Sequence, residues 1–385
     1  MHPTFGSPTT TNIKAVRSVL AMLVLRRFCK GAEPMTARPL FAQISPAIRN
    51  NAMLALCVLS LCTLGLSLSA STKKPDIVSF DPRGSVETIP NDINALGAIT
   101  GYYFDGNIFH GFVCDPDGTI TKFDAPAATA TVGASIDREG TITGYYFQGT
   151  LQGHGFVRSR DGHFTSFDPV GSTETEPVSI HSKGTIAGTY YDSNHVSHGF
   201  IRSVDGAIQT FDPPGSNGTV VTAMNAKGEI IGYYNEGYYQ HGFLRSPDGA
   251  YTTFDPPQAL QTFPTGINSG GEIVGNFDIN FSSVDGFVRH RDAEILISNV
   301  PTAADTFPNA INAAGVITGS YIANGERGFV RDSNGEFTSF NPPGWTFVRP
   351  TAINSQGTIV GDYTDSKGNI HGFVRSPDKR EETIQ

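Results

Sequence analysis

Short stretches in which apolar and polar residues alternate recur along the chain after residue 75. Four of them follow one another at residues 220–224, 229–234, 241–246 and 250–254, and they are rich in β-branched and aromatic residues. A period of two with this composition predicts β-strands. No stretch beyond residue 75 has the 3.6-residue period of an amphipathic helix. The pattern therefore predicts an all-β fold.

The last two strands of this group are separated by Pro247, Asp248 and Gly249. A three-residue hairpin loop usually follows a type I turn with a left-handed residue, and Gly suits that last place because it has no Cβ. This register sets His241 opposite Asp255, a cross-strand pair that stabilises a sheet. The same register predicts the pairs His110 with Asp124, His154 with Asp168, and His198 with Asp212, while Asp285 faces Asn299 and Arg327 faces Asn341.

The group of four strands recurs about every 43 or 44 residues to the end of the chain. A period in the forties with four strands per unit is typical of a β-propeller. We therefore predict a seven-bladed propeller of four-stranded antiparallel blades over residues 76–378. The Gly that opens each Gly-Tyr-Tyr stretch, or its variant, marks the seven copies at Gly101, Gly144, Gly188, Gly232, Gly275, Gly319 and Gly361.

Both ends of the chain offer an outermost strand for the last blade, so eight candidates compete for seven places. Residues 77–81 keep the Phe-Asp motif of the other outermost strands, whereas residues 382–385 have lost it. We therefore predict closure by the N-terminal strand, which sets Asp81 opposite His371. Residues 379–385 then form a tail.

Residues 1–70 differ in kind from the repeats. They hold seven basic residues and one acidic residue, and the run at 53–68 is uncharged and apolar. The small residues that follow suit signal-peptidase cleavage near Ala70, so we interpret residues 1–70 as an N-terminal extension with a secretory signal. The alternative is an uncleaved membrane anchor, because the apolar run is near the lower length limit for a membrane span.

The composition agrees with a turn-rich protein, since the 385 residues include 43 Gly and 24 Pro and only 16% are charged. Without residues 1–70 the formal charge is about −15. Such a surface repels phosphate backbones, which argues against a nucleic-acid partner. Cys114 is the one cysteine beyond residue 70, so no intramolecular disulfide is possible there and we expect a sheltered thiol.

The His-Gly-Phe elements followed by Val or Ile, Arg and Ser, together with the Ile-Asn-x-x-Gly and Gly-Tyr-Tyr stretches, resemble the HAF repeat family of probable extracellular bacterial proteins. The resemblance covers about residues 76–378. Gly replaces the Ala of the family's triplet here, and Asp285 and Arg327 replace its His in two units. The resemblance implies a secreted, periplasmic or cell-surface protein of a bacterium, and it implies no chemistry or ligand.

The five repeated histidines invite a metal hypothesis. Facing sheets lie about 10 Å apart, whereas zinc ligands lie about 2 Å from the metal, so adjacent blades share an ion only close to the central axis. No nucleophile repeats beside the His–Asp pairs, as a catalytic triad requires. We therefore interpret the pairs as structural and predict no metal and no cofactor. The repeated arginines suggest either ion pairs between blades or a basic ring around a channel.

The propeller strand order places the two tight hairpins of each blade on one face and the longer loops on the other. Aromatic side chains beside hydrogen-bonding groups suit sugars or peptides. The alternative for the recurring tyrosines is that they fill gaps between blades. The candidate ligand-binding residues on the longer-loop face are Tyr103, Asp105, Tyr146, Tyr191, Tyr234, Asn235, Tyr238, Tyr239 and Asp365.

We therefore expect an exported, non-catalytic binding or surface-interaction module, monomeric, for a glycan, a peptide or a cell-surface component. The alternative is a polysaccharide-active lyase or hydrolase with its site on the same face. A catalytic centre should lie where the repeat fails, because one copy alone performs the chemistry. Those departures include Glu174, Glu176, His195, Asn276, Asp278 and residues 345–349. A third hypothesis is structural packing at the cell surface.

Overall fold

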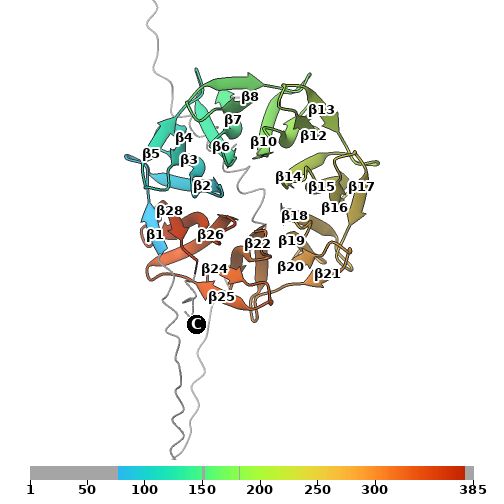
Figure 1. Ribbon diagram of the computed structural model, residues 1–385. Coiled ribbons are helices and arrows are strands. Elements are labelled where there is room, and N and C mark those ends of the chain that lie inside the picture. The colour runs from blue at the N-terminus through green and yellow to red at the C-terminus, as the bar shows by residue number, and fades with distance from the viewer. Residues whose placement is uncertain (1–76, 150–151, 182, 378–385) are drawn as a thin grey trace, which may run out of the picture. The chain divides into compact units, whose positions relative to one another are not determined.

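The computed structural model describes residues 77–149, 152–181 and 183–377, and within them the backbone forms 28 strands and no helix. The strands pair in antiparallel sets of four, called blades below and named by their first strands, which stand side by side around a central axis (Figure 1). The predicted signal segment at 1–70, with its apolar run at 53–68, and the tail at 379–385 lie outside the described residues. No described segment forms a helix suited to crossing a bilayer.

The first strand of each blade lies nearest the central axis (Figure 1). A β-bulge interrupts most of these strands just before their tight turn, as between Val221 and Ala223. A Cβ on the opposite Gly232 would lie 2.0 Å from the Val220 carbonyl oxygen, which explains why Gly recurs there. The first strands are β2 (Glu87–Ile93), β6 (Ala130–Ile136), β10 (Glu174–Ile180), β14 (Thr219–Met224), β18 (Gln261–Ile267), β22 (Asp305–Ile311) and β26 (Trp345–Ile353).

The second strands carry the Gly-Tyr-Tyr stretches away from the tight turn. Gly228 occupies the left-handed place in one such turn, with a φ of 81°. The second strands are β3 (Ile99–Phe104), β7 (Ile142–Gln148), β11 (Ile186–Tyr191), β15 (Ile230–Glu236), β19 (Ile273–Asp278), β23 (Ile317–Ile322) and β27 (Ile359–Asp365).

The third strands carry the His-Gly-Phe elements and end at the repeated Arg or, in β4, at Cys114. Each pairs with the second strand of its own blade. The third strands are β4 (Phe109–Cys114), β8 (Gln152–Arg158), β12 (Ser197–Arg202), β16 (Tyr239–Arg245), β20 (Val284–Arg289), β24 (Glu326–Arg331) and β28 (Ile370–Arg375).

The fourth strands are short and outermost (Figure 1). The predicted hairpin register is confirmed, since Phe243 lies opposite Thr253 and Gly249 has a φ of 92°. The fourth strands are β5 (Ile120–Phe123), β9 (Phe164–Phe167), β13 (Ile208–Phe211), β17 (Tyr251–Phe254), β21 (Ile295–Ile297), β25 (Phe337–Phe340) and β1 (Ile77–Phe80).

The strand β1 pairs with β28, so the first described strand takes the fourth place in the β26 blade. In this register Phe80 lies opposite Gly372. The β26 blade also contacts the β2 blade: the Thr351 hydroxyl donates to the Pro90 carbonyl at 2.8 Å, and the Asn354 amide donates to the Asn94 carbonyl at 3.3 Å.

The repeated Asn residues of the tight turns link one blade to the next. Asn225 donates to the Asn268 carbonyl at 3.0 Å, Asn268 to that of Asn312 at 3.2 Å, and Asn312 to that of Asn354 at 3.1 Å. Asn94 likewise donates to the Asp137 carbonyl at 2.9 Å. Buried amide groups of this kind need partners, so the repeat uses them to join blades.

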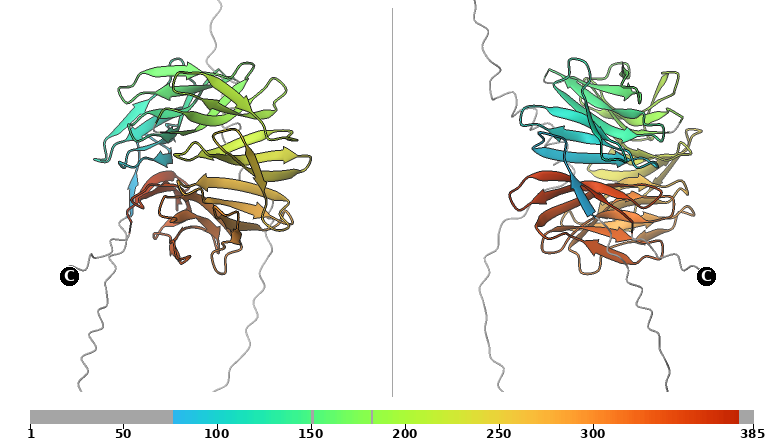
Figure 2. Two further views of the ribbon diagram at one scale, coloured as in Figure 1. Left: turned by 45° about the vertical axis from the view of Figure 1, so that its right-hand side comes forward. Right: turned by 60° about the vertical axis from the view of Figure 1, so that its left-hand side comes forward.

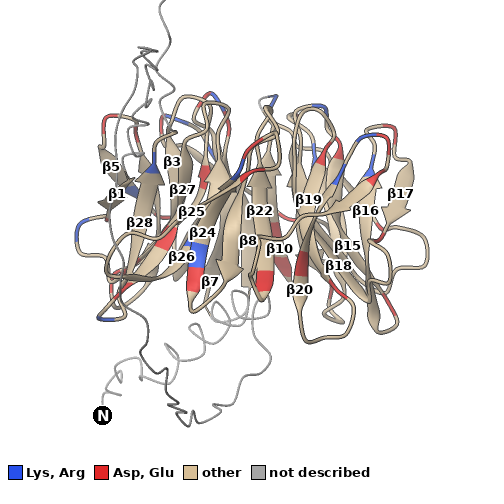
Figure 3. Ribbon diagram, turned by 90° about the horizontal axis from the view of Figure 1, so that it is seen from below, with Lys and Arg blue, Asp and Glu red and all other residues tan. Residues whose placement is uncertain are grey.

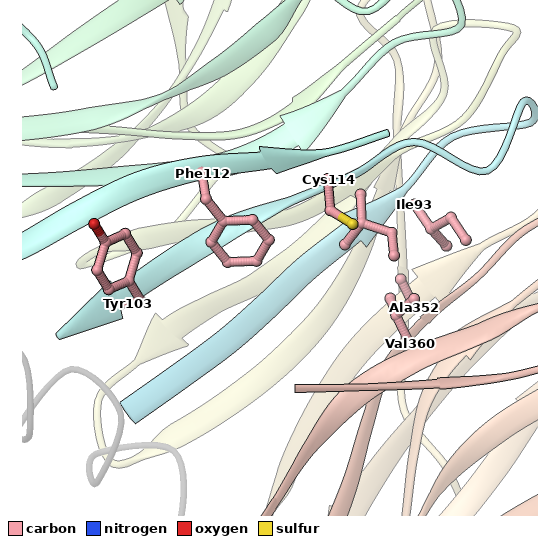
Figure 4. Close-up of a cluster of buried hydrophobic side chains, with 7 residues drawn as sticks. Ile93, Tyr103, Phe112, Cys114, Ala352 and Val360 are labelled. Atoms are coloured by element: carbon pink, nitrogen blue, oxygen red, sulfur yellow. The ribbon is translucent and has the colours of Figure 1, made fainter. Parts of the chain in front are cut away.

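Apolar side chains fill the gaps between adjacent blades. Figure 4 shows one such cluster, in which Tyr103, Phe112 and Cys114 of the β2 blade share a core with Ala352 and Val360 of the β26 blade. Burial, together with the nearby Asp115 carboxylate, raises the pKa of the Cys114 thiol to about 11. The thiol is therefore sheltered and protonated at neutral pH.

Most of the repeated arginines make a contact other than the predicted ion pairs or basic ring, since they lie on aromatic rings. Five of them stack on the Phe of the preceding blade's fourth strand, a cation–π contact that stabilises by about 0.5–2 kcal/mol. A ring face offers attraction without the cost of burying a carboxylate. The distances from the guanidinium carbon to the ring centre are 4.9 Å for Arg158 on Phe123, Arg202 on Phe167 and Arg245 on Phe211, 5.0 Å for Arg289 on Phe254, and 5.2 Å for Arg375 on Phe340.

The blades present two faces, seen obliquely in Figure 2 and edge-on in Figure 3. The tight-turn face carries the loops between first and second strands and between third and fourth strands. The long-loop face carries the loops between second and third strands and those that lead to the next blade. In the β14 blade the loop after Gly-Tyr-Tyr is shorter than expected, because Glu236 pairs with Tyr239 and leaves a two-residue turn.

Candidate functional site

The repeated His and Asp side chains meet at the long-loop end of the third and fourth strands. In the β18 blade, where the His is replaced, the Asn299 amide donates to Asp285 at 2.6 Å. The His Nδ1 to carboxylate distances are 2.7 Å for His110–Asp124, 2.6 Å for His154–Asp168, 2.8 Å for His198–Asp212, 2.7 Å for His241–Asp255 and 2.7 Å for His371–Asp81.

Three of these carboxylates also accept a hydrogen bond from the next blade. Thr175 donates to Asp168 at 2.6 Å, and Thr219 and Thr262 donate to Asp212 and Asp255 at 2.5 Å each. All three Thr residues are fully buried. The hydroxyl donates to the Asp and not to the His, so the arrangement joins blades and is not a nucleophile beside its base. The sequence analysis paired residues within one hairpin. It could not predict this hydrogen bond, because the Thr lies in another blade.

Two of the candidate ligand-binding residues, Asp105 and Asp365, lie against the histidines. His110 Nε2 is 3.1 Å from Asp105, and His371 Nε2 is 3.5 Å from Asp365. Although burial opposes it, the amides of Ile108 and Asn107 and the His110 ring hold the pKa of Asp105 at about 2. The Asn369 amide and side chain, with His371, hold the pKa of Asp365 at about 2.

Burial corrects the expectation that Tyr103, Tyr146 and Tyr234 present their rings on the long-loop face. They are only 5–6% exposed, because their rings fill the gaps between adjacent blades, as the alternative predicted, and pack against the paired histidines. The ring centres of Tyr103 and His110 are 5.1 Å apart, those of Tyr146 and His154 5.3 Å, and those of Tyr234 and His241 5.4 Å. The third blade places Tyr190 in this role, at 5.1 Å from His198, and Tyr191 is the half-buried residue after it.

Four exposed aromatic side chains lie toward the long-loop face, in three different blades. Tyr238 is 91% exposed and Tyr239 48% exposed at the turn of the β14 blade, beside the half-buried Asn235. Phe281 of the β18 blade and Phe347 of the β26 blade are exposed by 63% and 51%. Among the described residues, every exposed Phe, Tyr or Trp side chain belongs to this group of four. Phe281 and Phe347 stand at positions where the sequence departs from the repeat, and this departure was the signal that could have identified them.

A polar cluster that the repeat does not predict lies on the same half of the ring, in the β22 and β26 blades. Arg349 donates to Asp362 from Nε at 3.0 Å and from Nη2 at 2.7 Å. Ser320 donates to Glu326 at 2.7 Å. In other blades the positions of Arg349 and Asp362 hold residues such as Ile89 and Tyr102, which also lie directly opposite each other.

Burial governs the electrostatics of this cluster. It raises the pKa of Glu326, although Ser320 and Arg349 oppose the rise. It also raises the pKa of Asp362 against the attraction of Arg349, while Asp362 raises the pKa of Arg349. One guanidinium thus serves two carboxyl groups. Nearby, Trp345 stacks on Tyr363 with ring centres 3.5 Å apart.

The repeat also fails at Glu174 and Glu176 on β10. Burial raises the pKa of Glu174, although a hydrogen bond to Glu176 and the charge of His195 oppose the rise. Figure 3 shows many charged positions in the loops at the two edges of the blades, whereas Glu174 and Glu176 lie on a strand. Within the described ranges, no three His, Cys, Asp or Glu side chains gather as a metal site would require.

No protein-family model matches the chain, and a search of curated proteins finds no match.

Several solved structures share the fold. A streptogramin B lyase structure is 17% identical, with a TM-score of 0.53 over 78% of this chain and 98% of that chain. A catalytically inactive virginiamycin B lyase from Staphylococcus aureus with quinupristin is 15% identical, with a TM-score of 0.54 over 78% and 99%. The β-propeller domain of the trilobed protease from Pyrococcus furiosus is 7% identical, with a TM-score of 0.56 over 76% and 97%. Identities this low show the fold alone, which is an all-β propeller.

Proposed function

We propose that this protein is an exported, non-catalytic binding module whose long-loop face holds a neutral carbohydrate. The proposal rests on the exposure of aromatic side chains toward that one face, at Tyr238, Tyr239, Phe281 and Phe347. Aromatic faces pack against the apolar faces of sugar rings, while polar groups at the rim orient the hydroxyls. The formal charge of about −15 without residues 1–70 disfavours an anionic ligand.

The proposed architecture is a seven-bladed propeller closed by the N-terminal strand. The pairing of β1 with β28 supports this closure, as do the hydrogen bonds from Thr351 and Asn354 to the β2 blade. Export is proposed from the apolar run at 53–68 and from the resemblance to HAF repeat proteins. A monomer that displays this face at a bacterial surface or outside the cell is the form we propose.

A glycan array with the full chain, followed by calorimetric titration of the best ligand, tests the binding proposal. Tyr238→Ala should weaken binding at least tenfold, because the side chain is exposed and its loss leaves the fold intact. Val170→Ala is the matched control, since Val170 is a fully exposed apolar residue on the same face of the β10 blade. Equal affinity of both variants for the glycan would overturn the assignment of the site. Saturable binding of peptides but not of glycans would show that the ligand is a peptide.

A second candidate function is a polysaccharide-active lyase or hydrolase, which the Glu326 carboxyl favours. A carboxyl group whose pKa burial raises, beside an ion-paired carboxylate, is an arrangement suited to general acid catalysis. Release of reducing ends from polysaccharides measures this activity. Activity that Glu326→Gln abolishes, in a variant that still binds the glycan, would establish the enzyme; binding without release supports the module.

A further inference from the structure

A cavity of about 410 Å³ lies between the β18 and β22 blades and opens at the tight-turn face, away from the proposed carbohydrate site. Val288 and Leu296 of the β18 blade form one apolar wall, and Ile311 and Ile317 of the β22 blade form the other. Polar groups of Glu272, His290, Arg331 and Asn334 line the rest. The volume falls in the range of small-molecule sites, about 300–1,000 Å³.

The repeat explains why the cavity lies between these two blades. In five other gaps a Phe of the fourth strand lies beneath the Arg of the following blade, at 4.9–5.2 Å. In the β18 blade Ser298 stands at the position of that Phe. Arg331 therefore lacks a ring from its neighbour, and the ring it contacts is Phe337 of its own blade at 6.0 Å. The guanidinium remains at the cavity wall with one aromatic partner missing.

The polar wall has spare hydrogen-bond acceptor capacity. Glu272 accepts from Asn268 at 2.8 Å through Oε2 and pairs with His290 Nδ1 at 3.1 Å through Oε1. A carboxylate offers about four acceptor positions, so two are free for a donor from a ligand. The Arg331 guanidinium lies in the same wall and is attracted by Glu272, so the two opposite charges suit a neutral ligand.

We propose that this cavity binds a small neutral aromatic molecule with an N–H or O–H donor, of the indole or phenol class. Its ring takes the place of the missing Phe beneath Arg331 and packs on the apolar walls. Its donor bonds to Glu272. The site is independent of the long-loop face, so its occupancy does not depend on the proposed carbohydrate function.

Titration of the full-length protein with indole, followed by saturation-transfer NMR, tests the proposal. We expect saturable binding to the wild type, unchanged binding to Ser298→Ala and to Tyr238→Ala, and at least tenfold weaker binding to Ser298→Phe, whose ring fills the space. Leu296→Trp, at a side chain that is 41% exposed, closes the cavity mouth without touching the core and serves if Ser298→Phe fails to fold.

Ligand comparisons test the chemistry. Cyclohexanol should bind at least fivefold more weakly than phenol, because it keeps the hydroxyl and loses the aromatic ring. Benzoate should bind more weakly than phenol, because its ionised carboxylate has no hydrogen to donate to Glu272. Equal binding of indole to the wild type and to both filled variants, or no saturation up to the solubility limit of indole, would overturn the proposal.

Discussion

The gap between the β14 and β18 blades and the gap between the β18 and β22 blades differ at three repeated positions. In the first, Phe254 lies beneath Arg289, and Asp255 joins His241 to Thr262 of the next blade. In the second, Ser298 replaces the Phe, and Asp285 pairs with Asn299. The second gap contains the cavity. The comparison teaches that the repeated residues close the gaps between blades, and that a changed residue leaves room for another role.

Replacing Phe254 with Ser should copy the second gap into the first and give the largest effect. The ring is 8% exposed and makes the contact with Arg289. Its loss should therefore lower the free energy of unfolding by about 3–5 kcal/mol. Urea unfolding of both proteins measures this difference. Ser298→Ala, the matched change in the second gap, should cost less than about 1 kcal/mol; similar losses in the two variants would show that the gaps are equivalent.

Replacing Asp255 with Ala should give the next largest effect. The change leaves the buried Thr262 hydroxyl and His241 Nδ1 without their acceptor, which costs about 1–3 kcal/mol. Asn299→Ala in the second gap should cost about 1 kcal/mol, since its partner Asp285 remains solvated. The two urea midpoints compare these losses, and a greater loss for Asn299→Ala would contradict the role given to the carboxylate.

Replacing Arg289 with Met keeps an apolar stem and removes the cation. The expected loss is about 0.5–2 kcal/mol, because the guanidinium lies 5.0 Å from the Phe254 ring. Arg331→Met should lose less, since its ring lies 6.0 Å away. A double-mutant cycle of Arg289 with Phe254 isolates the contact. A coupling energy near zero would show that cation–π attraction does not stabilise this gap.

The smallest expected effect is a pH dependence at His371. Although burial opposes it, Asp81 and Asp365 raise the pKa of His371 above its ordinary value of 6.5. The stabilisation is therefore complete below pH 6.5 and is lost as the pH rises through the folded-state pKa. Unfolding midpoints at pH 6 and pH 9 should differ less in His371→Asn than in the wild type. An identical pH dependence in both proteins would show that protonation of His371 does not stabilise the fold.

The sequence was enough to predict the strands and the hairpin registers, because period-two alternation and Pro-Asp-Gly turns are local signals. The register then placed His241 opposite Asp255 without further information. The contacts of Thr262 and of Arg289 with the preceding blade were not predictable in this way, since they depend on how two blades pack.

The candidate site was predicted less well, for a physical reason. Tyr234 and Tyr238 both belong to Gly-Tyr-Tyr stretches and look alike in sequence, but strand pleat turns Tyr234 into the core and the turn leaves Tyr238 in solvent. The cluster of Glu326 and Arg349 depends on two neighbouring blades meeting near the axis. The departure of residues 345–349 from the repeat was the available signal for it.

We propose that the repeated residues hold the fold and that carbohydrate binds where the repeat fails. The affinities of two variants for the best carbohydrate test both parts of this proposal. The first variant, Tyr238→Ala with Phe347→Ala, removes exposed aromatic groups; the second, Arg289→Met, changes a repeated contact. Calorimetric titration should show at least tenfold weaker binding in the first and unchanged binding in the second. Unchanged binding in the first variant, with weakened binding in the second, would contradict the claim.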